Sequence, residues 1–208
     1  MERPDFVHLH LHSEYSLSDG IIRIKELVSR ASSLQYSAVG LTDLTNLFGL
    51  LEFYRSSREK GIKPIVGAEV NVIKDKDSLP APIVLLVKDK QGYINLTKIV
   101  SKAYVDGQVN GEPMVELSLL QKYSEGLIAL SGGMEGHVGQ SILAGNIPLT
   151  ESRIEFFKSI FDEDFFIEVH RLGKTNEEEY NKAAVDIATK MDVPIVATNN
   201  VRFLMPID

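Results

Sequence analysis

Strand-length apolar segments alternate with amphipathic segments along the whole chain, and this alternation constrains the fold more than any other feature. Several of the strand-like segments are β-branched and nearly continuous, as expected of strands covered on both faces. Seven segments read as strands: 6–12, 38–42, 64–73, 83–88, 127–131, 165–170 and 194–198. Apolar residues recur with helical spacing between them, around 21–31, 51–54, 94–103, 154–160 and 176–191. This order predicts a parallel α/β sheet.

The number of strands and the lack of a phosphate loop favour a closed sheet. Seven strands are more than a small doubly wound domain usually has, and no GxGxxG or GxxxxGK[ST] motif follows any of them. We therefore expect a (βα) barrel, with functional residues at the carboxyl ends of its strands. Segment 74–82 is expected to be an exposed loop, so residues 1–208 form one domain. The chain stops directly after the seventh strand, which suggests a fragment of a longer chain.

Composition narrows the classes of function. A formal net charge of −7 argues against a chain that grips nucleic-acid phosphates by itself. The absence of cysteine excludes disulfides and thiolate metal sites. Neither a secretory signal nor a membrane-length apolar stretch is visible, so we expect a cytoplasmic protein.

Histidines and carboxylates gather at the predicted strand ends. Side chains two apart on a strand share a face about 6.6 Å apart, so the first segment should direct its histidines the same way. Imidazoles completed by carboxylates are typical ligands of zinc, manganese or iron. The residues concerned are His8, His10, His12, Asp19, Asp43 and Glu69.

Each of these residues also has a plainer interpretation. An H-x-H pair alone is a weak signal, and Asp19 before Gly20 reads equally well as a turn or cap residue. Asp43 fits a strand-end cap better than a ligand. His137 reads as an exposed loop residue, and His170 as a solvated strand end. The last helical segment is expected to open with a Thr175-Asn176 cap and three glutamates against its dipole.

Six stretches give the chain a family resemblance. They are HLHLHSEYSLSDG (8–20), LTDLTNLFG (41–49), GIKPIVGAE (61–69), GYINL (92–96), EGLIALSGG (125–133) and PIVATNNVRFL (194–204). Together and in this order they resemble the PHP (polymerase and histidinol phosphatase) domain at the N-terminus of bacterial DNA polymerase III α subunits. The resemblance implies a distorted, TIM-barrel-like (βα) barrel of seven strands.

The resemblance also implies a site that holds up to three metal ions and hydrolyses phosphoesters in intact members. His10, His12, Asp19 and Glu69 match family ligands. Five further positions depart from the pattern, because a ligand is expected where this chain has Leu44, Gly133, Leu172, Asn200 and Arg202. Since a guanidinium has no lone pair and is always charged, Arg202 should repel a cation. We expect no metal cluster, although His10, His12 and Glu69 leave room for one weakly held ion. Arg202 is expected to pair with Asp19 or Glu69 instead.

The predicted function follows from this degenerate site. The resemblance implies a non-catalytic domain that serves as structure and docks the proofreading exonuclease (ε) subunit. The full-length polymerase would synthesise DNA with magnesium in another domain and contact DNA there. Two alternatives stay open: a metal-dependent phosphoesterase or 3′–5′ exonuclease working through His10, His12, Asp19 and Glu69, and a free-standing hydrolase of the histidinol-phosphatase type.

Overall fold

The computed structural model describes residues 6–74 and 78–204, and the chain divides into two compact units. The first unit consists of residues 1–69 and 199–208, and the second of residues 70–198. The predicted loop at 74–82 falls partly outside the described residues, so its course is not described as a whole. Within the described part of the chain, no helix is both long and apolar enough to cross a bilayer.

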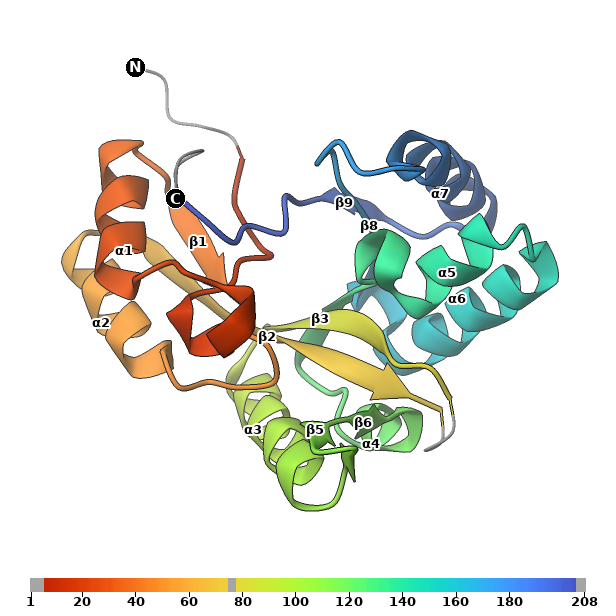
Figure 1. Ribbon diagram of the computed structural model, residues 1–208, viewed down its shortest axis with the longest axis horizontal. Coiled ribbons are helices and arrows are strands. Elements are labelled where there is room, and N and C mark those ends of the chain that lie inside the picture. Colours follow the sequence, from red (N-terminus) through yellow and green to blue (C-terminus); the bar gives the residue numbers. More distant parts are fainter. Residues whose placement is uncertain (1–5, 75–77, 205–208) are drawn as a thin grey trace. The chain divides into compact units, whose positions relative to one another are not determined.

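The first unit places two helices beside a short parallel strand pair. After the 3-10 segment η1 (Glu14–Asp19) come α1 (Ile24–Ser33), β1 (Ala38–Leu41), α2 (Leu50–Glu59) and the start of β2 (Lys63–Ile73). Strand β1 pairs in parallel with β2, from Ala38 opposite Lys63 to Leu41 opposite Val66. Helices α1 and α2 lie side by side (Figure 1).

Helical spacing explains how the first unit buries its core. In α1 the buried positions are Ile24, Leu27, Val28 and Ala31, which recur at intervals of three and four along one face. They join a cluster that includes Leu11, Leu41 and Phe53. Burial of each such side chain stabilises the fold by roughly 1.5–3 kcal/mol.

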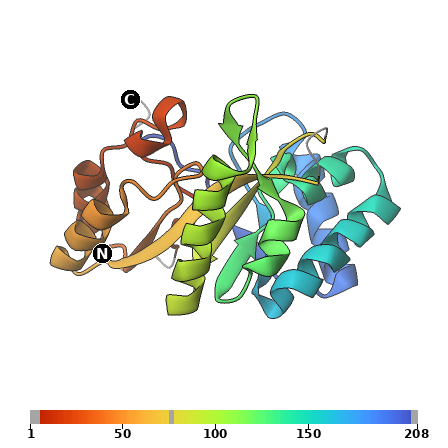
Figure 2. The same cartoon turned by 90° about the horizontal axis from the view of Figure 1, so that it is seen from below.

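The second unit contains most of the sheet. After the end of β2 come β3 (Ala81–Val87), α3 (Lys90–Val105), β4 (Gln108–Val109), β5 (Glu112–Pro113), β6 (Val115–Glu116) and α4 (Leu117–Lys122). The chain continues through β7 (Leu127–Leu130), η2 (Gly133–Glu135), α5 (His137–Leu143), α6 (Ile147–Phe161) and η3 (Asp162–Asp164). It ends with β8 (Phe165–Val169), α7 (Glu177–Met191) and β9 (Ile195–Ala197). Helix α3 packs against β3 and β7 (Figure 2).

Several strand pairs are parallel as predicted, but β3, which lies between β2 and β7 in the sheet, does not follow the prediction. β7 pairs in parallel with β8 and β8 with β9, whereas β3 and β7 are antiparallel, with Val84 opposite Leu130. Residues 74–80 between β2 and β3 are too few for a crossover, which needs a dozen or more residues. The prediction of an all-parallel sheet was therefore wrong at this pair, although the α/β class is confirmed.

The first predicted strand is also irregular. Residues 6–12 contain only an isolated bridge, between Leu11 and Val201. The amide of Gly40 donates to the carbonyl of His8 (2.6 Å) and that of Thr42 to Leu11 (2.9 Å). Between these two hydrogen bonds the first segment advances three residues, from His8 to Leu11, while the chain at β1 advances two, from Gly40 to Thr42. The additional residue of the first segment forms a β-bulge. This bulge interrupts the ladder and decides which histidines share a face.

Candidate metal-site remnant

The bulge separates His8 from the other two histidines. The side chain of His8 is half-buried, and its Nε2 lies 3.3 Å from the hydroxyl of Tyr36. The other edge of this segment is hydrogen-bonded to the backbone of residues 199–202. The amide of His12 donates to the carbonyl of Val201, and the amide of Val201 donates to the carbonyl of His10, each at 2.9 Å. His10 and His12 are therefore held together, and the prediction that His8 points with them was wrong.

His10, His12 and Glu69 form a buried cluster. One nitrogen of each imidazole and one carboxylate oxygen lie within 4.8 Å of one another. The Nε2 of His10 is 2.6 Å from Oε2 of Glu69, a short charge-assisted hydrogen bond. Burial alone would raise the pKa of Glu69, but its interactions with the two histidines, first of all the hydrogen bond from His10, outweigh burial and lower that pKa to about 2. Glu69 is therefore an anion at neutral pH.

His12 presents an unsatisfied nitrogen to this carboxylate. Its Nδ1 lies 3.1 Å from Oδ2 of Asp19, to which it donates, while its Nε2 lies 3.5 Å from Oε2 of Glu69. Burial, above all, lowers the pKa of His12, so the ring is neutral near pH 7. With the proton on Nδ1, the Nε2 lone pair faces a carboxylate oxygen and has no hydrogen-bond donor. A proton shared between them, or a cation bound to both, would satisfy the two atoms.

Arg202 contacts Asp19, the residue whose carboxylate also accepts from His12. Its guanidinium forms an ion pair with Oδ2 of Asp19 and also donates to the backbone carbonyl of Asp19 at 3.0 Å. The expected pairing of Arg202 with a site carboxylate is thus confirmed for Asp19. The charge of Arg202 also opposes protonation of His12. Asp19 is shared between a cation and an imidazole.

The loop that brings Asp19 to His12 is organised by Asp43. The Asp43 carboxylate is buried and accepts from the amide of Ser13 (2.6 Å), the Ser13 hydroxyl (2.8 and 2.9 Å) and the Ser16 hydroxyl (2.7 Å). At Gly20 the chain passes so close to Ser13 that a Cβ would lie 2.3 Å from the Ser13 carbonyl oxygen. Asp43 is thus a structural cap, but of the loop that follows His12 and not of its own strand.

Three of the positions that depart from the family pattern lie in this unit. Leu44 is half-buried and forms a parallel bridge with Glu69. Asn200 has a backbone φ of 43°, and its buried Oδ1 has no hydrogen-bond partner. Arg202 is the third. Leu44 is therefore paired with Glu69 through the backbone, and Asn200 and Arg202 flank Val201, which is paired with Leu11 between the two histidines. None of the three side chains offers an imidazole or a carboxylate.

The two other positions lie in the second unit, where His170 fills space that a side chain at position 133 would need. A Cβ on Gly133 would come within 2.6 Å of Cε1 of His170, and Gly133 has a φ of 60°. His170 is only 7% exposed, so its interpretation as a solvated strand end was wrong. Its Nε2 lies 3.2 Å from Oε1 of Glu168, which also accepts from the Thr198 hydroxyl at 2.5 Å.

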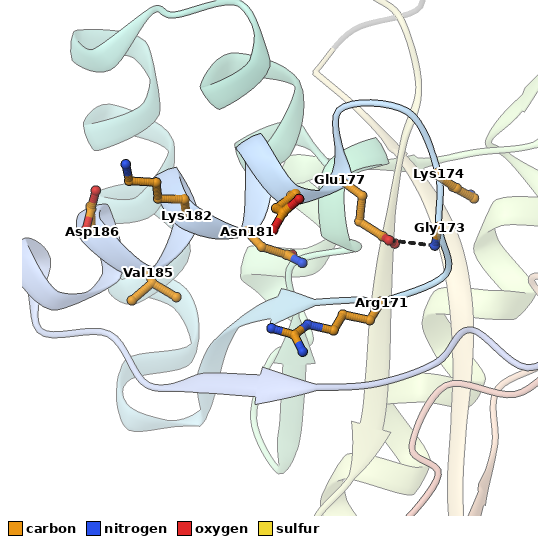
Figure 3. Close-up of a pocket in the computed structure, with 9 residues that line it drawn as sticks. Arg171, Gly173, Lys174, Glu177, Asn181, Lys182, Val185 and Asp186 are labelled. Atoms are coloured by element: carbon orange, nitrogen blue, oxygen red, sulfur yellow. Dashed lines mark hydrogen bonds between the residues drawn. The ribbon is translucent and has the colours of Figure 1, made fainter.

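Leu172 lies in a loop that is fastened to α7. The carboxylate of Glu177 accepts from the amide of Leu172 at 2.8 Å. It also accepts from the amide of Gly173 at 2.8 Å (Figure 3). Asn176 is the N-cap residue of α7 and three glutamates follow it, as predicted, but it has a left-handed φ of 64° and makes no side-chain capping bond, so the prediction was wrong for that bond. Beside this loop, a surface pocket of about 740 Å³ is lined by cations and anions alike, among them Arg171 and Asp186.

Two residues in the second unit differ from their sequence interpretation. His137 begins α5 instead of lying in an exposed loop; it is half-buried, with its Nε2 3.1 Å from the Val72 carbonyl oxygen. Glu168 is fully buried and was not singled out. An acid inside the otherwise apolar segment 165–169 was the signal that would have identified it.

The donor set fits one metal ion better than a cluster. Two imidazoles and an anionic carboxylate can hold a single divalent ion, and the contact between Asp19 and His12 is the kind that orients a ligating histidine. A second ion would need Asp19, which Arg202 already neutralises. Such an ion would supply Lewis acidity and a more acidic bound water.

Comparison with known proteins points to one family. A sequence model described as PHP domain matches residues 8–172. The chain is 41% identical over 206 residues to DNA polymerase III subunit alpha of Vibrio cholerae and 43% identical to that of Escherichia coli K12. Each alignment covers 98% of this chain but 18% of the relative, so the chain spans less than a fifth of these proteins' length.

Solved structures support the fold. A protein from Bifidobacterium adolescentis assigned as a metal-dependent phosphoesterase matches with a TM-score of 0.61 at 13% identity, covering 97% of this chain and 90% of that one. An amidohydrolase from Chromobacterium violaceum, with bound sulfate and no metal, matches with a TM-score of 0.58 at 17% identity, covering 94% and 87%. These likenesses fit the distorted, TIM-barrel-like fold that was predicted.

Proposed function

Because this chain belongs to the PHP domain family, we propose that it is the N-terminal PHP domain of a replicative DNA polymerase III α subunit with a degenerate metal site. In this proposal the domain has a structural role and docks the proofreading exonuclease (ε) subunit. The full-length protein synthesises DNA in the cytoplasm, using magnesium in its polymerase domain. Identity of about 40% along nearly the whole chain supports membership of this polymerase group.

The ion pair between Arg202 and Asp19 carries the proposal for a degenerate site. In a working cluster, divalent ions balance the charge of the site carboxylates. Here a guanidinium contacts one of them and also donates to its backbone carbonyl. Arg202 thus provides, as part of the chain, one positive charge that a bound ion would otherwise supply. In this proposal the contact between Arg202 and Asp19 holds the loop of Asp19 against residues 199–202 without any metal.

A docking role accords with the lack of a complete hydrolytic site. A polymerase chain that cannot excise a mismatched nucleotide needs a separate nuclease for proofreading. A rigid domain close to the polymerase is a suitable platform for that nuclease. Binding of the purified ε subunit should therefore be measurable by biolayer interferometry, and it should persist after exhaustive chelation. Failure of ε to bind, with or without metal, would contradict the docking role.

The experiment for the degenerate site is metal analysis combined with hydrolysis of bis-p-nitrophenyl phosphate. We expect less than one equivalent of zinc or manganese after purification without chelator, and no hydrolysis above background. Replacing both Asn200→Asp and Arg202→His should increase metal uptake, because it restores an anion and a lone pair. Near-stoichiometric metal together with hydrolysis in the unmodified protein would overturn this part of the proposal.

One observation favours a second candidate, a phosphoesterase or 3′–5′ exonuclease with a single ion. The unsatisfied Nε2 of His12 faces Glu69, and His10 lies beside them, so these three residues would hold that ion. His12→Ala should then abolish both metal binding and hydrolysis. His8→Ala is the matched control, because His8 contacts Tyr36 outside the cluster. If the two variants behave alike, this candidate is excluded.

A further inference from the structure

An apolar cavity lies beside helix α6 in the second unit. Its volume is about 520 Å³, large enough for one or two side chains. Leu117, Leu149, Phe156 and Phe157 line it, and only Phe157 among them is fully covered by the protein. Leu79, at the rim, is 80% exposed. A large exposed leucine next to an apolar cavity is typical of a surface that becomes covered on binding.

Among the described residues that line this cavity, the charged groups are cationic. Arg153 and Lys74 line it, and among the described lining residues there is no aspartate or glutamate. Arg153 donates to the backbone carbonyl of His137 and forms no ion pair with any carboxylate of the described residues. Arg153 is half-buried, and this burial lowers the pKa of its guanidinium. Burial also lowers the pKa of His137, so that ring adds no charge of its own.

Several other cations of the second unit pair with carboxylates, although Lys158 donates to the backbone carbonyls of Met191 and Asp192 instead. Lys88, Lys174 and Lys190 each contact a carboxylate, as expected in a chain with a net charge of −7. A partly desolvated guanidinium without a counter-ion is costly unless an anion arrives. Guanidinium and carboxylate can form two parallel hydrogen bonds, which makes a carboxylate the anion best suited to this position. The cavity therefore combines an apolar floor with a ready carboxylate receptor.

We propose that this cavity binds a peptide segment of a partner protein in which a large apolar side chain is adjacent to a carboxylate. The apolar side chain fills the space between Leu149 and Phe156, and the carboxylate pairs with Arg153. Leu79 and Lys74 then cover the bound segment from the rim. The inference deepens the proposed docking function, on which it rests, by giving the chemistry of the docked segment.

The test is a selection from a phage-displayed hexapeptide library on the purified protein. The Leu79→Asp variant serves for counter-selection. We expect enriched sequences that contain phenylalanine, leucine or tryptophan next to aspartate or glutamate. No enrichment over the Leu79→Asp protein, or enrichment of sequences without an acid, would overturn the inference.

Variants then test the two parts of the cavity with the enriched peptide, by fluorescence polarisation. Leu79→Asp and Arg153→Lys should each weaken binding about tenfold or more, the second because lysine keeps the charge but loses the forked geometry. Leu51→Asp is the matched control: Leu51 is 61% exposed on α2 in the first unit and should leave binding unchanged. Equal loss in the control would contradict the inference, and circular dichroism confirms that each variant is folded.

Binding of the ε subunit separates this inference from the proposed function. If ε binds and Leu79→Asp leaves its affinity unchanged, docking stands but this cavity is not the place, and the inference fails. If the acidic peptide binds with the expected variant effects while ε does not, the cavity is a peptide site and the proposed partner is wrong.

Discussion

Replacing Arg202 by alanine should destabilise the protein measurably, although the residue is not in an apolar core. The side chains of Arg202 and Asp19 are 30% and 38% exposed, so solvent screens their ion pair and it contributes about 1 kcal/mol at most. The bond from the guanidinium to the Asp19 carbonyl adds roughly 0.5–1 kcal/mol. Arg202→Ala should therefore lower the free energy of unfolding by about 1.5 kcal/mol.

The assay is thermal and urea unfolding followed by circular dichroism. For a chain of this length, 1.5 kcal/mol corresponds to a decrease of about 3–6 °C in Tm. A double-mutant cycle with Asp19→Asn isolates the pair, and its coupling energy should be about 0.5–1 kcal/mol. Arg23→Ala is the control, because Arg23 is exposed and its nearest contact to Glu26 is 4.0 Å; it should change Tm by less than 1 °C.

An unchanged Tm in Arg202→Ala would refute the reasoning, because the contacts of the guanidinium with Asp19 would then not stabilise the fold. A coupling energy near zero together with a lowered Tm would be a different failure. It would mean that Arg202 acts through its apolar stem and not through Asp19.

Three further predictions concern other parts of the structure. Gly133→Ala should destabilise by at least 2 kcal/mol more than Gly145→Ala, because both glycines have a φ near 60° but only the first would meet His170; equal urea midpoints would contradict this. Since the pKa of Glu69 is lowered from 4.5 to about 2, its carboxylate should stabilise the fold by roughly 3 kcal/mol above pH 5, a contribution lost as the pH falls from about 4.5 to 2. Unfolding of the Glu69→Gln variant should therefore depend less on pH in that range, and an identical dependence would count against the pKa. Glu177→Gln should cost roughly 1–2 kcal/mol and speed amide exchange in the loop before α7; unchanged exchange would exclude the role of this carboxylate.

The sequence pattern was sufficient for the α/β class and for most elements. Helix α1 follows the spacing of Ile24, Leu27, Val28 and Ala31, and all four residues are buried. Strand β8 follows the apolar segment that begins at Phe165. Such elements are determined by local periodicity, which the sequence displays directly.

Other features depend on contacts that no local pattern records. The bulge between His8 and Leu11 arises from pairing with β1, so alternation alone grouped His8 with the wrong neighbours. Asn176 had the composition of a cap, but Glu177 satisfies the loop amides instead. His10, His12 and Glu69 were grouped through a family resemblance, whereas the burial of His170 became visible only in the structure.

Anomalous diffraction at the zinc edge, from crystals grown with zinc, tests most directly the proposal that the metal site is degenerate. We expect at most one weak peak, between His10, His12 and Glu69, with the Arg202 guanidinium still on Asp19. Two or three fully occupied ions, with Asp19 released from Arg202 to ligate one of them, would contradict it.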